Sequence, residues 1–570
     1  MAARIREEQV WLSRHLEERL AETTASGTLR LPGELPDVAR AVHWRGFACV
    51  EKVTAQPQLG WVEAAGRVRV WVSYVAAGSE SPDPAAAVWG GRLEGELPFT
   101  YRLDAGTFHD SARWSVRAQV GAVDGRFRAD GRTADVDVVL QLAFQGVERQ
   151  PTRLVTHASS TGPCRIEAST TLLRTSLAEA LERTRVQVSD ERELGANLPA
   201  AAGRPRVVEV EATPAITQAR VEAGTVSVEG VVRFDVLFVQ PRPARAAATA
   251  PEPADAAEAA SPEATAGADR GWEVSWASWT SGEAFRFTLP VEQARPGDTV
   301  RARATAADVV ARPAGGSRFA FEVEVELEVG LYSPRAVQVA TDVRGCEQLP
   351  VEQRKSTVTV EQWLAELRRS FAASATLELP AGLPPVERVL WAGVTLHPHP
   401  PRPDGPRVLV SASCTPWMFY VPYKADARTG GLGFVEWTGA MALEQPLALP
   451  ELRPGAQLAC SVSFAGVAVE ADLINRQTVE LSVAGILLLG GRQAHAQEVV
   501  AEAVAIQARA QDPPPFFYLV VTQAGDTLWK LSRRYDVPVQ ALVEANPELQ
   551  AVPAEEPLPA GRKLFVRRGG

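Results

Sequence analysis

Alternating apolar and polar residues recur along most of the chain. The clearest segment is FEVEVELEV at residues 321–329, where apolar side chains and four glutamates occupy alternate positions. A period of two with charge on one side predicts a half-buried antiparallel strand. Because similar segments occur at 134–144 and 478–489, we predict a mainly β fold.

Two stretches far apart in the chain have nearly the same sequence. Residues 28–40 read TLRLPGELPDVAR, residues 376–388 read TLELPAGLPPVER, and a weaker copy begins at Arg192. Each copy is followed by an alternating segment, a breaker-rich stretch and further strands. An internal repeat of this kind indicates tandem domains. We therefore predict three repeated antiparallel domains that resemble β-sandwiches or barrels.

Segments rich in Leu, Ala, Glu and Arg precede the β units. They are residues 172–184 (LLRTSLAEALERT), residues 359–371 (TVEQWLAELRRSF) and the charged N-terminal stretch. Their composition favours helices, which would connect the units. The predicted domains, each with its helix, are 1–150, 165–335 and 357–507, followed by a small C-terminal domain at 516–568.

The second unit contains an insertion at residues 241–270, PRPARAAATAPEPADAAEAASPEATAGADR. It has too few large apolar side chains to bury a core. The other two units have short loops at the same place. We therefore predict a disordered insertion at a loop tip.

Overall composition narrows the function classes. A chain of 570 residues is too long for one core, and its net charge of -10 argues against broad binding to nucleic acid. The cysteines are far apart and lack any C-x-x-C spacing, so we predict small buried hydrophobic side chains and neither a disulfide framework nor a zinc site. They are Cys49, Cys164, Cys346, Cys414 and Cys460.

The N-terminal residues MAARIREEQVWLSRHLEERLAE are charged throughout and lack the apolar region of a secretory signal. No run of apolar residues is long enough for a membrane-spanning helix. From these two observations we expect the chain to stay in the cytosol of the cell that makes it.

The C-terminal residues predict a strand, two helices and a second strand. Gly525 and Asp526 form a turn in which Asp526 can cap a helix over 527–535. A second helix is predicted at 539–545, and the last strand at 563–566. We expect a compact βααβ module.

This module resembles the LysM family through GDTLW and ANP, motifs that lie in nearly the expected places between residues 518 and 566. The resemblance implies binding of glycans that contain N-acetylglucosamine, in a shallow groove between two loops. On this sequence the implied groove residues are Gly525, Asp526, Thr527, Leu528, Asn546, Pro547, Val552 and Leu558. Two alternatives stay open: Asp526 as a helix cap alone, and Asn546 as a turn residue. Trp529 is expected in the core.

The order of β-rich repeats and a C-terminal LysM module also resembles a family of Firmicutes sporulation proteins that includes a spore-coat morphogenetic protein. Patterns such as TLELPAGLPPVERV carry this second resemblance. It implies a scaffold in the mother-cell cytoplasm whose LysM module docks on the coat-basement ATPase at the forespore surface. A cell-wall protein that binds peptidoglycan is the alternative.

Enzyme motifs are missing from the sequence. We find no G-x-S-x-G, no H-E-x-x-H and no G-x-x-x-x-G-K-[ST]. His397 and His399 lie among prolines, where an unliganded pair is the simpler interpretation. We therefore predict no catalytic residue, no metal site and no cofactor, and we regard glycan hydrolysis as a distant third hypothesis.

Overall fold

The protein folds mainly as antiparallel β-sheet, as the alternating pattern predicts. The computed structural model describes residues 2–16, 18–78, 83–161, 165–195, 204–242, 271–346, 349–364, 366–405, 407–425, 431–449, 452–453, 456–506 and 517–567. Within these ranges strands dominate, and the α-helices are two short ones near the C-terminus.

Three sheets share one arrangement, in which a central strand pairs with a long strand that precedes it in the chain and with shorter strands; all of the shorter strands follow the central strand except β19 (Arg402–Asp404), which precedes it. The central strands are β4 (Trp61–Ala76), β11 (Thr225–Pro241) and β20 (Arg407–Pro422). The preceding strands are β3 (Val38–Gln56), β10 (Arg206–Glu222) and β18 (Val386–Pro398). The shorter strands are β5 (Val88–Arg92), β6 (Leu97–Asp104), β12 (Trp272–Thr280), β13 (Phe285–Pro290), β19 (Arg402–Asp404), β21 (Gly433–Glu436) and β22 (Met441–Ala448).

Three very long strands organise the other sheets. They are β8 (Thr133–Thr161), β15 (Arg318–Arg344) and β24 (Thr478–Ala505), with 29, 27 and 28 residues. At about 3.3 Å per residue each spans roughly 90 Å. Their partners are β1 (Ala2–His15), β2 (Arg19–Arg30), β7 (Arg113–Phe127), β9 (Glu167–Glu193), β14 (Thr299–Gly315), β16 (Val351–Trp363), β17 (Leu367–Glu378) and β23 (Gln457–Asn475).

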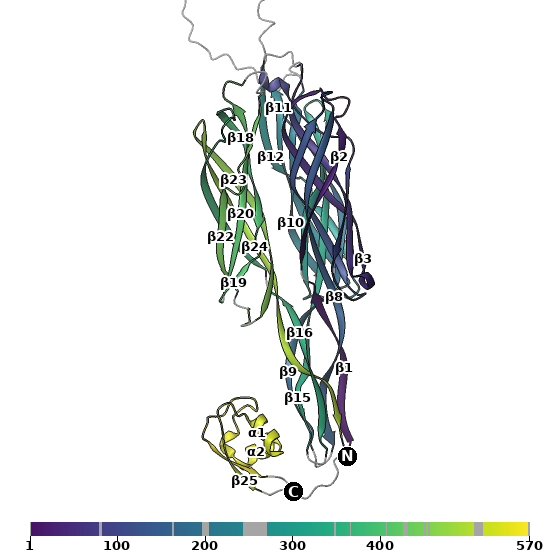
Figure 1. Cartoon of the computed structure of the whole chain (residues 1–570), viewed down its shortest axis with the longest axis vertical. Coiled ribbons are helices and arrows are strands. Elements are labelled where there is room, and N and C mark those ends of the chain that lie inside the picture. Colours follow the sequence, from purple (N-terminus) through teal and green to yellow (C-terminus); the bar gives the residue numbers. More distant parts are fainter. Residues whose placement is uncertain are drawn as a thin grey trace, which may run out of the picture.

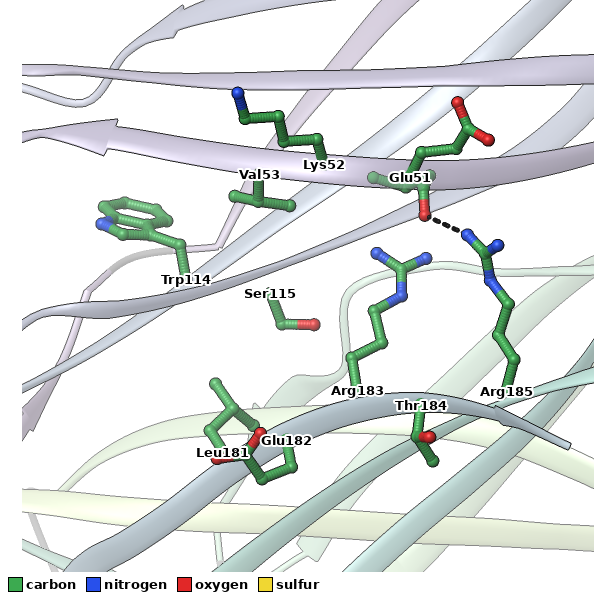
Figure 2. A pocket seen from close by; sticks show the side chains of 11 residues that line it. Glu51, Lys52, Val53, Trp114, Ser115, Leu181, Glu182, Arg183, Thr184 and Arg185 are labelled. Carbon is green, nitrogen blue, oxygen red and sulfur yellow. Dashed lines mark hydrogen bonds between the residues drawn. The ribbon is translucent and has the colours of Figure 1, made fainter.

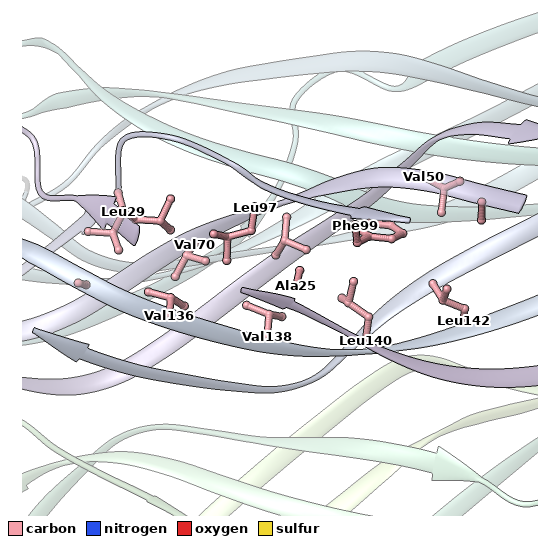
Figure 3. Close-up of a cluster of buried hydrophobic side chains, with 14 of the residues drawn as sticks. Ala25, Leu29, Val50, Val70, Leu97, Phe99, Val136, Val138, Leu140 and Leu142 are labelled. Carbon is pink, nitrogen blue, oxygen red and sulfur yellow. The ribbon is translucent and has the colours of Figure 1, made fainter. Parts of the chain in front are cut away.

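Each sheet around a long strand packs against one of the short-stranded sheets, and apolar side chains fill the space between them. In the first unit, Val70 and Leu97 from one sheet meet Val136 and Leu140 from the other (Figure 3). Comparable buried clusters lie in the second and third units. That the units are repeated copies of one domain, with the boundaries given above, stays a prediction. The strands β8 and β15 continue past residues 150 and 335.

The second halves of the long strands leave the packed sheets as two-stranded ribbons, β1 with β8, β9 with β15 and β16 with β24. The three ribbons come together in a narrow shaft, which we call the stalk (Figure 1). Its centre is apolar, because Leu154, Val339 and Val499 are fully buried against one another's ribbons. The stalk therefore joins segments from the beginning, middle and end of the chain.

The predicted connecting helices are wrong. The N-terminal stretch forms β1 and β2, residues 172–184 lie within β9, and residues 359–371 form parts of β16 and β17. Helix-favouring composition is a weak preference that tertiary contacts override. Here continuous pairing with the long strands satisfies the backbone, and alternate residues such as Val358 and Val360 reach the stalk core.

Three further expectations concern the insertion, the cysteines and membrane-spanning helices. The insertion predicted at 241–270 lies almost wholly outside the described residues. Cys49 and Cys414 are buried thiols, but Cys346 is disulfide-bonded, so the expectation that every cysteine is a free hydrophobic side chain is wrong. Among the described residues, no helix has the length and apolar character needed to cross a membrane.

Candidate ligand-binding module at the end of the stalk

The C-terminal module has the predicted order of elements. β25 (Phe517–Val521) pairs antiparallel with β26 (Lys563–Arg567), and the helices α1 (Leu528–Tyr535) and α2 (Val539–Ala545) lie between them in the chain. A short 3₁₀ turn follows at Pro547–Leu549. One apolar cluster holds the module together, and it contains Val520, Leu528, Leu531, Val537, Leu542, Leu549, Leu558, Leu564 and Val566.

Thr527, and not Asp526, caps the first helix. The Lys530 backbone N–H donates a hydrogen bond of 3.1 Å to Thr527 Oγ1. The Asp526 carboxylate instead accepts from the Gln523 backbone N–H at 2.8 Å and pairs with Arg534. These two interactions lower the pKa of Asp526, with the backbone hydrogen bond the larger cause. Asp526 therefore shapes the turn before α1.

Asn546 is buried and fully hydrogen-bonded. Its amide nitrogen donates to the carbonyl oxygens of Leu542 and Phe565, both at 2.7 Å, and its Oδ1 accepts from the Phe565 N–H at 2.8 Å. These bonds fasten the end of α2 to β26. Of the two open interpretations of Asn546, the structural one accounts for all of its polar atoms.

The two loops of the implied groove lie against each other. The Leu558 N–H donates to the Asp526 carbonyl at 2.7 Å, and the Trp529 N–H donates to the Ala554 carbonyl at 2.9 Å. Thr527 and Pro557 form an isolated bridge beside these bonds. The structure thus brings residues 525–529 together with residues 554–558.

Exposure divides the eight implied groove residues into two groups. The side chains of Leu528 and Leu558 are in the module core, and Asp526, Thr527 and Asn546 are also buried. Gly525 and Pro547 are exposed and Val552 is half-buried. Pro547 and Val552 can therefore contact a ligand through their side chains and Gly525 through its exposed backbone, whereas the buried residues can offer only backbone groups at the loop surface.

Trp529 is not in the module core, contrary to expectation. Its ring is half-buried, and its Nε1–H donates a hydrogen bond of 2.8 Å to Asp342 Oδ2 near the end of β15. Trp529 therefore joins the module to the stalk. In Figure 1 the module lies beside the far end of the stalk.

Asp342 and Arg344 hold the module from the stalk side. Arg533 Nη1 lies 2.5 Å from Asp342 Oδ2, and Arg344 Nη1 donates to the Val537 carbonyl at 2.7 Å. Burial opposes ionisation of Asp342, but hydrogen bonds from Gln353 and Trp529 and the charge of Arg533 lower its pKa. Asp342 is therefore an anion at neutral pH and a strong acceptor.

The sequence did not identify Asp342 or Arg344 as residues that contact the module. Asp342 and Trp529 are 187 positions apart, and nothing in either local sequence marks the contact. The carboxylate belongs to an ordinary strand, where an exposed charge is the usual interpretation.

A hollow of about 590 Å³ lies between β3, β7 and β9 (Figure 2). Its two central cations are already engaged: Arg183 pairs with Glu326, and Arg185 donates to the Val50 carbonyl at 3.0 Å. Both arginines are therefore committed to partners within the protein.

Of the two histidines considered as a metal pair, His397 and His399, the second lies within hydrogen-bonding distance of two serine hydroxyls. The ring nitrogens of His399 lie 3.4 and 3.3 Å from the hydroxyls of Ser411 and Ser413. Among the residues that the structure describes, no group of three or more His, Cys, Asp or Glu side chains is placed to hold a metal ion.

Comparison with known proteins gives one match. The family model of the LysM domain matches residues 520–567, close to the boundaries predicted from the sequence. No curated protein and no solved structure matches the chain. The strand, helix, helix, strand module at the C-terminus is a LysM domain.

Proposed function

We propose that this chain is a non-enzymatic binding protein that attaches, through its LysM domain, to peptidoglycan or a chitin-like glycan containing N-acetylglucosamine. The observation that carries the proposal is the LysM match at residues 520–567, since this domain suggests binding of such glycans. The β units and the stalk would then serve as a long body that carries the attached module.

The loop surface of the module suits a glycan. Gly525 has a positive φ of 82° and no neighbouring atoms where a side chain would be, so its backbone is accessible at the edge of the loop, where its carbonyl accepts a hydrogen bond of 2.7 Å from Lys530 Nζ. Exposed peptide groups can hydrogen-bond an acetamido group, while Pro547 and the half-buried Val552 offer apolar surface to a sugar face.

The test is calorimetric titration of the full chain with N-acetylglucosamine oligomers, together with sedimentation on insoluble peptidoglycan. We expect saturable binding that Gly525→Leu abolishes by filling the bare edge. Gly382→Leu is the matched control, because Gly382 also has a positive φ and open space but lies in the third unit. Absence of binding by the unsubstituted chain would refute the proposal.

A second candidate is the spore-coat scaffold that docks on the coat-basement ATPase. The observation that favours a protein partner is an exposed apolar face on the small sheet of the module. Leu519 and Phe565 pair across β25 and β26 and are 59% and 58% exposed. Phe517 and Val521 extend the same face, which the basic side chains of Lys563 and Arg567 border. Aromatic residues, Phe among them, and Arg are enriched at protein–protein interfaces.

Two experiments distinguish the glycan-binding protein from the spore-coat scaffold. Phe565→Ser should abolish binding to the ATPase and leave sugar binding intact, because Phe565 lies on the exposed face of the small sheet, whereas its neighbours Leu564 and Val566 pack into the core. A tagged copy of a coat scaffold should form a ring at the forespore surface inside the mother cell. Labelling of vegetative cell walls would count against this candidate and for the glycan-binding protein.

A further inference from the structure

We propose that the cavity between the LysM domain and the stalk is a second saccharide subsite, which extends the loop groove and is completed by the start of β9. This inference rests on the proposed glycan binding, and it adds that the stalk supplies part of the site. It implies that a long oligomer contacts two parts of the chain that are far apart in sequence.

The cavity has a volume of about 470 Å³ and two walls of different origin. One wall belongs to the LysM domain and the other to the first residues of β9. The lining residues are Trp529, Val539, Ala554 and Glu555 on the first wall and Glu167, Ala168, Ser169 and Thr170 on the second.

The cavity borders the groove loops directly. Trp529 follows Leu528 in the first loop region, and its backbone is hydrogen-bonded to Ala554 in the second. Both residues line the cavity as well. A glycan lying along the two loops would therefore reach the cavity without a break.

One wall offers a fixed aromatic surface. The bond from Trp529 Nε1 to Asp342 holds the indole in one orientation, and Val539 and Ala554 add small apolar contacts beside it. Arg344 reinforces this placement by binding the carbonyl of Val537. An indole held in this way can cover the C–H face of a sugar ring and has little rotational freedom to lose on binding.

The opposite wall offers hydrogen-bond acceptors. Glu167 Oε2 is buried and has no hydrogen-bond partner among the described residues, which is unusual for a carboxylate oxygen. Ser169, which shares a face of β9 with Glu167, carries a hydroxyl, whereas the hydroxyl of Thr170 already accepts a hydrogen bond of 2.9 Å from Gln338. Sugar hydroxyls are donors that would satisfy the free oxygen of Glu167.

The charge of the lining selects among glycans. The cavity contains two carboxylates, Glu167 and Glu555, whereas its remaining lining residues carry no charge. Sugars that carry a carboxylate or phosphate would be repelled. The ligand class is therefore a neutral, chitin-like run of N-acetylglucosamine.

The test is calorimetric titration of the full chain with the dimer and the hexamer of N-acetylglucosamine. The dimer probes the loops alone, whereas the hexamer is long enough to reach the cavity as well. We expect Glu167→Ala to weaken hexamer binding by about tenfold, the usual loss for one hydrogen bond to a charged group, and to leave dimer binding unchanged. The matched control is Glu352→Ala, because Glu352 is an exposed stalk carboxylate outside the cavity.

A second variant tests whether any effect of Glu167→Ala reflects only a local change in structure. Asp342→Ala removes the acceptor that holds Trp529 and Arg533, so it should reduce the affinity for the hexamer to that for the dimer. If the unsubstituted chain binds both oligomers and neither variant lowers hexamer affinity, the subsite is refuted and glycan binding stands. If the unsubstituted chain binds neither oligomer, the proposed function fails and the subsite fails with it.

Discussion

Leu154→Ala should loosen the whole stalk and not only its own ribbon. Leu154 is fully buried, and its cluster includes Val10 from its own ribbon, Leu173 and Val339 from the second, and Val358 from the third. Removing a fully buried leucine side chain from a packed core costs about 3 kcal/mol. Because the cavity would be shared by the three ribbons, the loss should lower the stability of all of them.

Hydrogen exchange followed by mass spectrometry measures this loss locally, which suits a chain of several units that does not unfold in one step. A loss of about 3 kcal/mol corresponds to exchange faster by roughly a hundredfold. We expect this acceleration in the amides of β16, although its residues are some two hundred positions from the substitution. Leu20→Ala is the control, since Leu20 is 76% exposed on β2 and should change little. Acceleration confined to β1 and β8 would refute the shared core.

The remaining predictions concern single contacts. Asn546→Ala should destabilise the LysM domain by about 3 kcal/mol, because it leaves the N–H and carbonyl of Phe565 unpaired, and faster exchange in β26 would show this. Thr527→Ala should cost about 1 kcal/mol by removing the cap of α1, whereas Thr527→Ser should restore most of the loss in thermal unfolding. Burial lowers the pKa of His15 below 6.5 despite its hydrogen bond with Glu361. The unfolded chain therefore binds this proton more readily, so stability should fall as pH drops from about 6.5 toward the folded pKa, and His15→Gln should flatten that part of the pH profile of thermal unfolding.

The sequence predicted those parts of the fold that depend on local pattern. The alternation in residues 321–329 placed a strand that is present within β15, and GDTLW with ANP located the LysM domain. Residues 172–184 misled because Leu, Ala and Glu favour a helix in isolation. Their true environment is set by β15, which pairs with β9 over its whole length and lies more than a hundred positions away along the chain.

The same difference between local and long-range sequence information explains which residues of the candidate site could be predicted. Thr527 and Asn546 were found because the loops they stabilise follow a short, recognisable pattern; the structure shows their structural hydrogen bonds, and their contact with a ligand stays a prediction. Asp342 and Glu167 were not found, because each is an unremarkable carboxylate until the stalk and the LysM domain meet. A site assembled from two such parts has a physical consequence: its affinity depends on how firmly the module is held. In the proposed subsite the Asp342 contacts would therefore couple the position of the LysM domain to the length of glycan that it binds, and the stalk would take part in recognition as well as in spacing.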